Sequence, residues 1–475
     1  MKSKTIVKVI ITVVASTLFV LLGISVAASV EESRPDVIEM GVQEDPYVRS
    51  NVACEILEKH MQVSAGEPYT IWEDYYGGGW FSEDGLLHVY LTDLNVKEEL
   101  VSLLGEYADA VVFLKSEHSL NEMHIIAETV AAELIEEGIR VSARGVDEIN
   151  QKAFVGVIVE DVEKAETYIR MKSNEADNIE IKPMGYFDLQ IGEEDSDRDE
   201  TIEPAQLKPY SYFFDVFELS SNGIKSNMTT VLKGADKIMS SGCSMSLGIC
   251  GRYNGNNCLV TCGHGLGNGY TITSSSGTMI GNVVHHSYSN NANGDYSIVK
   301  ITNTYFAPSY YVKTTPLYKA YSSHNHNGKN VIIKGYVTSN NNVHGTVIAS
   351  DVTVTSVCNN VQITINGVNV CQLSGSAVTM SGDSGGTYYY GNTFYGVHNG
   401  SDSSSGVNYT TYTPYCLFNS IGFTIYPHSH NYNYTDYNAT YHKCTCTLCG
   451  YYFMQEHSLT WDYDNNCCIM CGHHD

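Results

Sequence analysis

The chain has 475 residues and a mass of 52.4 kDa, which is more than one ordinary domain and enough to bury several cores. Its 43% hydrophobic and 17% charged residues exclude a mainly disordered protein, although the formal net charge is -26. Only 27 basic residues stand against 53 acidic ones, which argues against a nucleic-acid partner, because phosphate recognition depends on clustered Lys and Arg.

Charge divides the chain into two parts. Residues 29–230 hold 15 basic and 43 acidic residues, whereas residues 231–427 hold 8 basic and 5 acidic ones. The first part has helical patterns, and the second is rich in Asn, Ser, Thr, Gly and Tyr with short β-type runs. The composition thus predicts two different kinds of domain that meet near residue 230.

The first residues have the layout of a secretory signal. Lys2, Lys4 and Lys8 precede or flank the start of an apolar run over residues 9–28, which ends in small residues ahead of an acidic stretch. We therefore expect residues 1–28 to be a signal peptide and the protein to be exported. An uncleaved membrane anchor over the same apolar run is the alternative, because a span takes about 20 residues.

Helices and strands alternate in the acidic part. The patterns predict a hairpin, a capped helix, a buried strand and an amphipathic helix, at Trp80–Thr92, Ser119–Gly138, Ala153–Glu160 and Asp161–Lys172. The helix has the strongest signal, because Ser119 and Glu122 form a capping box ahead of apolar residues at helical spacing. We expect an α+β domain within residues 29–190, then an exposed linker at residues 191–230 with a processing site.

Residues 231–427 show many short β-branched or aromatic runs, separated by Asn, Ser and Gly clusters, and no long helical periodicity. Examples begin at Tyr296, Val331 and Gly345. This pattern predicts an all-β domain, as a barrel or a sandwich. The last 48 residues, 428–475, are rich in Tyr, His and Cys and are expected to be a separate small module.

Three short motifs of the β-rich part carry chemistry, and they surround His264, Asp295 and Ser384 in that order. A serine hydroxyl becomes a nucleophile when an imidazole takes its proton, and a buried carboxylate then holds the imidazole in the required tautomer. Glycines around Ser384 let the amides of Gly382 and Ser384 point at one spot, where they would stabilise an oxyanion by about 3 kcal/mol for each donor. The three motifs together predict a catalytic triad.

These motifs make residues 231–427 resemble the chymotrypsin-like serine endopeptidases, especially the bacterial branch of α-lytic protease and the streptogrisins. The resemblance implies two packed six-stranded antiparallel β-barrels with the active site between them. Upstream, Tyr76 to Asp93 is similar to the opening of that family's pro-domain, which assists folding and is then removed. The resemblance therefore implies that residues 29–190 are the pro-domain of a zymogen.

The sequence departs from the family pattern near the site. Gly265 follows the predicted catalytic histidine where the family usually has Cys, and Cys262 precedes it, which puts the usual bridge from Cys243 in doubt. Met380 stands where many relatives carry a half-cystine, so no disulfide pairing is assigned. Asn399 takes the place of a Ser that supports the catalytic Asp in many relatives.

The predicted specificity pocket favours an acidic side chain. Val378 stands where the trypsin branch has the Asp that receives basic side chains, so trypsin-like cleavage is disfavoured. Ser381, His398 and Ser401 resemble the glutamyl endopeptidases, which use a His and two serines to receive a carboxylate. An imidazole and two hydroxyls can supply the hydrogen bonds that a desolvated carboxylate needs. The alternative is a half-exposed His that lines an apolar pocket.

Glutamate usage supports the same specificity. No glutamate occurs between Glu218 and Glu456. An enzyme that cuts after Glu would need such a gap to resist cleavage of its own chain. The gap also makes Glu203 and Glu218 candidate self-processing points. The competing explanation is that the whole β-rich part is poor in charge.

The tail has two CxxC units, Cys446 with Cys449 and Cys468 with Cys471. This spacing is typical of a structural zinc site inside a cell, whereas disulfides compete outside it, and both assignments stay open. Attachment to a cell surface through this module is a further expectation. His324 and His326 lack ligand spacing and are expected on a surface turn.

Together these features predict a secreted serine endopeptidase, made as a zymogen and preferring Glu or Asp before the scissile bond. Its partners would be polypeptide substrates and its own pro-domain, and catalysis would need no cofactor. Two alternatives stay open: the same fold with apolar specificity, and an inactive homologue that acts as a surface adhesin.

Overall fold

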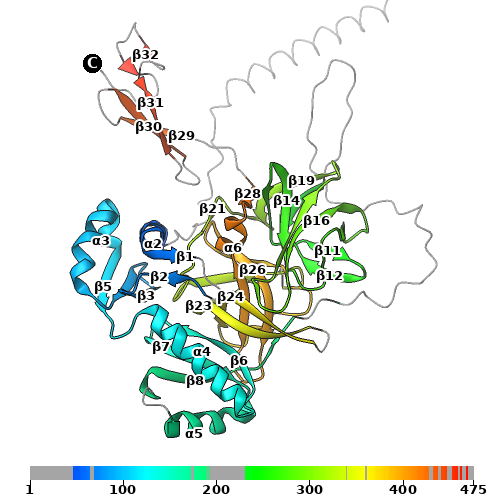
Figure 1. Ribbon diagram of the computed structural model, residues 1–475. Coiled ribbons are helices and arrows are strands. Elements are labelled where there is room, and N and C mark those ends of the chain that lie inside the picture. The colour runs from blue at the N-terminus through cyan, green and yellow to red at the C-terminus, as the bar shows by residue number, and fades with distance from the viewer. Residues whose placement is uncertain are drawn as a thin grey trace, which may run out of the picture. The chain divides into compact units, whose positions relative to one another are not determined.

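The computed structural model describes residues 46–64, 69–172, 176–189, 192, 230–338, 340–358 and 361–426, with short pieces of the tail at 432–436, 440–446, 452–457, 461–462 and 467–468 (Figure 1). All of these residues belong to one compact unit that starts at Asp45. The predicted signal peptide, Glu203 and Glu218 lie outside the described residues. No helix among the described residues is both long enough and apolar enough to cross a membrane.

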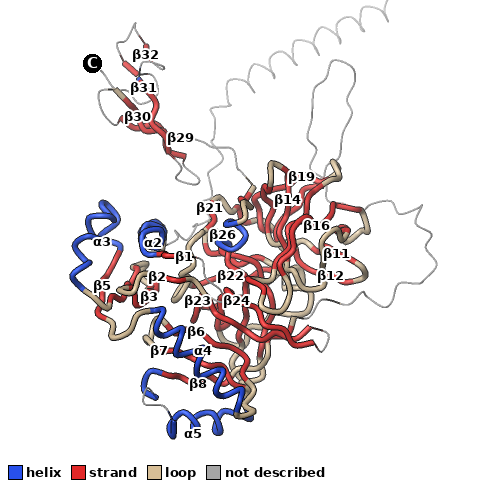
Figure 2. Tube along the Cα trace, viewed as in Figure 1, coloured by secondary structure: helices blue, strands red, loops and turns tan. Residues whose placement is uncertain are grey.

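An α+β region comes first in the described chain. Its longer helices are α2 (Val48–Met61), α3 (Lys97–Leu104), α4 (Leu120–Glu136) and α5 (Val162–Lys172). Its strands are β1 (Gln62–Ser64), β2 (Ile71–Trp72), β3 (Tyr76–Phe81), β4 (Leu87–Leu91), β5 (Val111–Lys115), β6 (Val141–Asp147), β7 (Lys152–Val157), β8 (Ile179–Pro183) and β9 (Phe187–Asp188). Figure 2 shows the longer helices gathered in this region, while strands fill the rest of the molecule.

The local elements expected in this region are confirmed. Ser119 caps α4, because its Oγ accepts from the amide of Glu122 at 3.3 Å while its own amide donates to the Glu122 carboxylate at 2.9 Å. β3 and β4 form the predicted antiparallel hairpin, and β7 is followed by α5 as the pattern indicated. These elements need only short-range signals, which the sequence carries in full.

The β-rich part supplies the remaining strands of the protein core. They are β10 (Thr230–Gly234), β11 (Lys237–Ser240), β12 (Cys243–Ser246), β13 (Ile249–Tyr253), β14 (Asn256–Thr261), β15 (Thr271–Ser274), β16 (Met279–Ser287), β17 (Ala292–Asn293), β18 (Tyr296–Ile301), β19 (Phe306–Val312), β20 (Thr315–Pro316), β21 (Lys319–Ala320), β22 (Asn330–Lys334), β23 (Val343–Cys358), β24 (Val361–Leu373), β25 (Thr387–Tyr390), β26 (Thr393–Asp402), β27 (Tyr409–Pro414) and β28 (Thr424–Ile425). One short helix, α6 (Tyr415–Ser420), follows β27. The tail adds β29 (Tyr432–Asp436), β30 (Tyr441–Cys446), β31 (Tyr452–Glu456), β32 (Trp461–Asp462) and β33 (Cys467–Cys468).

Strand pairing gathers most of these strands into two large sheets. An eight-stranded sheet has the order β12-β11-β15-β16-β18-β14-β13-β28, and a twelve-stranded sheet contains β22 to β27. The all-β prediction for this part is thus confirmed at the level of a β domain after an α+β region. The strand pairs form these two sheets, and the two closed six-stranded barrels that the resemblance implies remain an expectation.

The twelve-stranded sheet crosses the predicted domain boundary. The α+β region adds β6, β7 and β8 to the edge strand β23, where Thr353 pairs with Arg144 and Val354 with Ala143. Backbone groups at the edge of β23 are thereby satisfied by the α+β region, as in strand addition to an open sheet edge.

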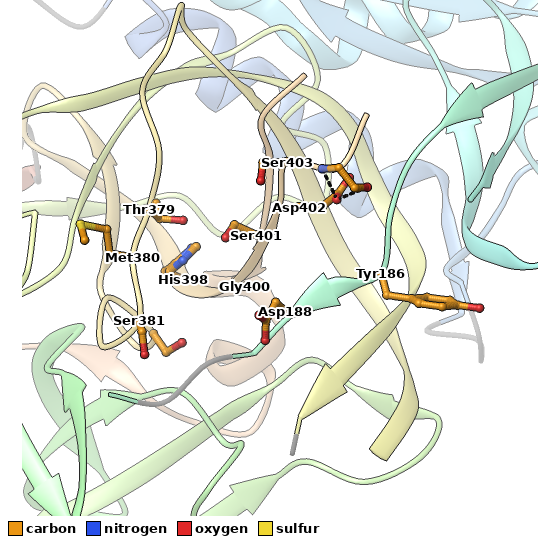
Figure 3. Close-up of a pocket in the computed structure, with 12 residues that line it drawn as sticks. Tyr186, Asp188, Thr379, Met380, Ser381, His398, Gly400, Ser401, Asp402 and Ser403 are labelled. Atoms are coloured by element: carbon orange, nitrogen blue, oxygen red, sulfur yellow. Dashed lines mark hydrogen bonds between the residues drawn. The ribbon is translucent and has the colours of Figure 1, made fainter. Parts of the chain in front are cut away.

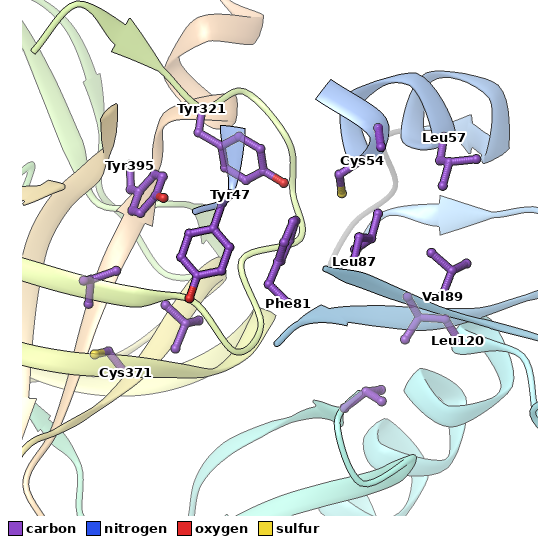
Figure 4. Close-up of a cluster of buried hydrophobic side chains, with 14 of the residues drawn as sticks. Tyr47, Cys54, Leu57, Phe81, Leu87, Val89, Leu120, Tyr321, Cys371 and Tyr395 are labelled. Atoms are coloured by element: carbon purple, nitrogen blue, oxygen red, sulfur yellow. The ribbon is translucent and has the colours of Figure 1, made fainter. Parts of the chain in front are cut away.

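A shared hydrophobic cluster also joins the two parts. Tyr47 and Phe81 from the α+β region pack beside Tyr321 and Tyr395 from the β domain, and all four are buried (Figure 4). Lys329 extends into this cluster, with its ammonium 3.0 Å from the ring centroid of Tyr321. The aromatic faces offset part of the desolvation cost of this buried cation.

Carboxylates of the α+β region hold the loop that precedes Lys329. Glu58 on α2 accepts hydrogen bonds from Ser323 Oγ at 2.6 Å and from the amides of Asn325 and His324 at 2.9 Å each. The expectation that His326 lies on a surface turn is wrong, because this residue is fully buried. The α+β region covers the loop, a contact that no local pattern could predict.

Candidate active site

His264 and Asp295 come together because their strands are neighbours. Thr261 at the end of β14 pairs with Ser297 near the start of β18, so the residues just beyond these ends share one edge of the sheet. The Nδ1 of His264 lies 2.5 Å from Oδ2 of Asp295. The amides of Gly263 and His264 both donate to Oδ1 of Asp295 at 2.7 Å, so the carboxylate is held by three contacts.

This pair is fully buried, which sets its electrostatics. Burial by itself lowers the pKa of the His264 imidazole, but the charge and hydrogen bond of Asp295, together with the nearby Cys262, raise the pKa well above the usual 6.5. The pair thus stabilises an imidazolium at a site that excludes water, as a general base needs after it has taken a proton.

Two side chains fix the backbone of Asp295 rather than its carboxylate. Thr413 Oγ1 accepts from the Asp295 amide at 2.8 Å, and Asn399 Nδ2 donates to the Asp295 carbonyl at 2.8 Å. Thr413 also donates to Asn399 Oδ1 at 3.1 Å, which closes a buried network. Asn399, which stands where many relatives have Ser, therefore does support Asp295, although it holds the main chain of Asp295 and not its carboxylate.

Ser384 lies next to the same network. Its hydroxyl donates to the carbonyl of Asn399 at 2.9 Å. Among the described residues, Nε2 of His264 has no hydrogen-bond partner, although it is buried. The structure therefore forms the predicted His264–Asp295 contact, while the hydroxyl of Ser384 points to a different acceptor.

The loop around Ser384 has the backbone shape that the glycines predicted. Gly382 has a φ of +96°, and a Cβ there would lie 2.5 Å from the ring of Tyr336. The amides of Gly382 and Ser384 donate to no other described residue, so they stay available for an oxyanion. Asp383, a residue that the sequence reasoning passed over, buttresses the loop by accepting from the amides of Met380 and Thr338 at 3.0 and 3.1 Å.

A pocket of about 510 Å³ opens beside Ser384. Ser381, His398 and Ser401 all line it, as Figure 3 shows, so the three predicted pocket residues do share one cavity. Asp188 and Asp402 also line this pocket, and the sequence reasoning missed both of them. No sequence signal pointed to Asp188, because it comes from the α+β region.

His398 is neutral in this pocket. It is 2% exposed, and burial, with the neighbouring His264 acting in the same direction, lowers its pKa to about 3. Its Nδ1 lies 3.4 Å from the hydroxyl of Tyr388. The ring can therefore offer a hydrogen bond without carrying a charge of its own.

The cysteines near the active site can be compared with the predictions, whereas those of the tail cannot. Cys262 is buried, with its Sγ 4.0 Å from the His264 carbonyl, and forms no disulfide within the described part of the chain. No group of three or more His, Cys, Asp or Glu among the described residues could hold a metal ion. The predicted set of Cys446, Cys449, Cys468 and Cys471 lies outside the residues whose side chains are described.

One part of the chain matches a known protein family, and several solved structures are similar to it. Residues 252–421 match the family model described as Trypsin. Among solved structures, a chymotrypsin of Cellulomonas bogoriensis is 19% identical, with 42% of this chain and 100% of that chain covered and a TM-score of 0.34. Protease A of Thermobifida fusca is 18% identical, with 42% and 100% covered and a TM-score of 0.34.

A further solved structure is a glutamic acid-specific serine protease that uses a histidine triad in substrate binding. It is 23% identical, with 41% of this chain and 100% of that chain covered and a TM-score of 0.34. No curated protein matches the chain. The family match and the sheet architecture together show that this chain carries a trypsin-family serine protease domain, preceded by an α+β region.

Proposed function

We propose that the β domain is a serine endopeptidase that acts through Ser384, His264 and Asp295. The observation that carries this proposal is the buried His264–Asp295 pair, whose supporting Asn399 also accepts from the Ser384 hydroxyl. Nε2 of His264 is buried without a partner among the described residues. Such an orphaned atom costs about 1–3 kcal/mol, a cost that the hydroxyl of a rotated Ser384 or the leaving group of a substrate would remove.

Catalysis then follows from groups of the chain alone. Rotation about χ1 frees the Ser384 hydroxyl from Asn399, and His264 Nε2 takes its proton as Oγ attacks the substrate carbonyl. The amides of Gly382 and Ser384 receive the oxyanion. His264 next protonates the leaving amine, and water, activated by the same imidazole, hydrolyses the acyl-enzyme. Because nucleophile, base and oxyanion donors are all protein groups, this chemistry needs no cofactor.

The pocket supports a preference for Glu or Asp before the scissile bond. His398 is uncharged and can donate one hydrogen bond, and Ser381 and Ser401 lie in the same cavity. These three groups are of the kind that a buried carboxylate requires, because its oxygens must all be hydrogen-bonded when water is excluded.

One observation favours a second specificity, for an uncharged side chain. Asp402 is 6% exposed and lines the pocket, where its carboxylate accepts from the amide of Gly185 at 2.8 Å. A fixed negative charge in the wall repels a second carboxylate. An amide or an apolar side chain would avoid this repulsion.

The remaining parts of the chain have proposed roles as well. Residues 1–28 would direct export, and the α+β region would serve as a pro-domain that is removed from the secreted enzyme. The tail would be held by zinc or by disulfides through Cys446, Cys449, Cys468 and Cys471, and would serve as a surface attachment module.

Labelling with a fluorophosphonate tests the proposal directly, because this probe reacts only with an activated serine. We expect the label on Ser384 in the secreted chain and no label in the Ser384→Ala variant. Rates on matched peptides with Glu, Gln or Phe before the scissile bond then decide the specificity. An unlabelled protein that cuts none of the peptides would refute the enzyme proposal, and equal rates on Glu and Gln would refute the carboxylate pocket.

A further inference from the structure

A second pair of reactive groups lies outside the predicted active site. Sγ of Cys416, in α6, lies 3.7 Å from Nδ1 of His324, although the two residues are 92 positions apart in the chain. A thiol beside an imidazole is a nucleophile beside a base, because the thiolate is the reactive form of cysteine. The proposed catalytic mechanism uses neither residue.

Contacts from the α+β region hold this imidazole in place. The amide of His324 donates to the Glu58 carboxylate at 2.9 Å. The ring of Trp72 packs against the His324 ring in an edge-to-face arrangement, with the two centroids 6.2 Å apart. The base is therefore held beside the sulfur by the folded contact between the α+β region and the β domain.

The charges around the pair favour a proton on the imidazole. Burial by itself lowers the pKa of His324, but the sulfur of Cys416 and the carboxylates of Glu58 and Asp351 raise it to about 10. An imidazolium at this distance stabilises the thiolate form of the sulfur. The two side chains together thus form a thiolate–imidazolium pair.

The pair lines a cavity of about 820 Å³ between α2 and α6. The walls of this cavity include Glu55 and Lys59 on α2 and His285 and His286 on β16. Cys416 is itself 6% exposed, so its sulfur is reached through the cavity and not from the open surface. The sulfur is therefore open to a small molecule and closed to a folded protein.

We propose that Cys416, with His324 as its proton partner, is a site of covalent modification by a small disulfide. The thiolate of Cys416 attacks one sulfur of the disulfide, the S–S bond breaks, and a mixed disulfide forms on Cys416. The leaving thiolate takes the proton of the His324 imidazolium and departs as a thiol. The cysteine is thereby oxidised, and one half of the small disulfide is reduced. Ser384 takes no part, so the inference stands apart from the proposed peptidase activity.

Cys358 provides a comparison within the same chain. It is half-buried and its sulfur contacts the hydroxyl of Tyr288, whereas Cys416 is almost fully buried. Accessibility alone predicts faster reaction at Cys358, and the thiolate–imidazolium pair predicts faster reaction at Cys416. Burial raises the pKa of Cys250 and of Cys371 to about 12, so both should stay unmodified as long as the chain is folded.

The experiment treats the full-length Ser384→Ala chain with hydroxyethyl disulfide near neutral pH and follows each cysteine by peptide mass mapping. We expect Cys416 to react at least tenfold faster than Cys358. A further His324→Gln substitution should slow Cys416 at least tenfold and leave Cys358 unchanged. Because mapping reports each cysteine separately, reaction of the tail cysteines does not obscure the comparison.

A pH profile separates this role of His324 from a structural one. In the parent Ser384→Ala chain, the rate at Cys416 should change little between about pH 6 and pH 8, because the imidazolium keeps the thiolate present. With His324→Gln it should rise about tenfold per pH unit, as it does for an ordinary thiol with a pKa near 8.5. The other charged or histidine side chains around the pair are the same in both chains, namely Glu55, Glu58, Lys59, His285, His286 and Asp351.

Two results would overturn the inference: reaction at Cys416 that is no faster than at Cys358, or a rate and pH profile at Cys416 that His324→Gln leaves unchanged. Protection of Cys250 and Cys371 shows in the same map that the variant is folded. If His324→Gln has lost this protection, the comparison of Cys416 with Cys358 in the parent chain decides by itself.

Discussion

Replacing Glu58 by Gln should weaken the contact between the α+β region and the β domain. The Glu58 carboxylate is 6% exposed and accepts four hydrogen bonds, from Ser323 Oγ, from the amides of His324 and Asn325, and, at 3.9 Å, from the thiol of Cys54. A carboxamide keeps one acceptor oxygen and turns an NH2 group toward the remaining donors. One or two hydrogen bonds to a charged acceptor are lost, at about 1.5–3 kcal/mol each.

We therefore expect the free energy of unfolding to fall by about 1.5–6 kcal/mol, a factor of roughly 10 to 20,000 in the folding equilibrium. The assay is urea unfolding of the full-length chain in a Ser384→Ala background, which prevents self-cleavage, with tyrosine and tryptophan fluorescence as the signal. The matched control is Glu98→Gln on α3, an exposed glutamate of the same region, for which we expect a change within about 0.5 kcal/mol. If Glu58→Gln lowers stability no more than Glu98→Gln does, the argument that Glu58 fastens the loop is wrong.

Three further predictions concern pH and the oxyanion. Because Asp295 raises the pKa of His264 above 6.5, the imidazole can act as a base only above that pH, and the acidic limb of the pH profile of kcat/KM should lie above 6.5. In the Asp295→Asn variant this limb should move to lower pH, and kcat should fall strongly. Burial raises the pKa of Glu148 to about 8, so between pH 4.5 and 8 the carboxyl is protonated in the folded state and ionised in the unfolded state. The Ser384→Ala precursor should therefore lose up to about 1.4 kcal/mol of stability per pH unit as pH rises through this range. Glu148→Gln should flatten that dependence in urea unfolding at several pH values, and an unchanged slope would contradict it. Gly382→Ala should lower kcat about 10²- to 10³-fold, because the backbone there needs a φ of +96° and a Cβ would collide with Tyr336. A smaller effect on peptide hydrolysis would contradict the role of the Gly382 amide as an oxyanion donor.

What the sequence could predict follows from how far apart the interacting residues lie. The capping box at Ser119 and Glu122 spans three residues, so the pattern alone predicts α4 and its start. His264 and Asp295 lie on ends of two paired strands, and the motif order was enough to expect their meeting. Chemistry that a short motif carries could thus be inferred before the fold was known.

Contacts between distant segments could not be inferred in this way. Glu58 and Ser323 are 265 residues apart, and nothing near either residue marks it as half of a pair. The same holds for Asp188 in the pocket, because Asp188 on β9 and its partner Ser401 on β26 are 213 residues apart in the sequence. The hydroxyl of Ser384 was also beyond prediction, since its rotamer depends on the carbonyl of Asn399 in a strand that follows it.

The uneven distribution of glutamate links the proposed specificity to the proposed removal of the α+β region. Glu58 and Glu148 are 6% and 4% exposed, so an enzyme that cuts after Glu could not reach them while the α+β region is docked. Once the chain between the α+β region and the β domain is cut, as the proposed function requires, only non-covalent contacts would hold that region, and each dissociation would expose its many glutamates to cleavage. The β domain has none between Glu218 and Glu456 and would survive the same encounter. Mass action then makes release irreversible, because a destroyed pro-domain cannot rebind. An enzyme with apolar specificity would lack this asymmetry, since both halves of the chain are rich in apolar residues.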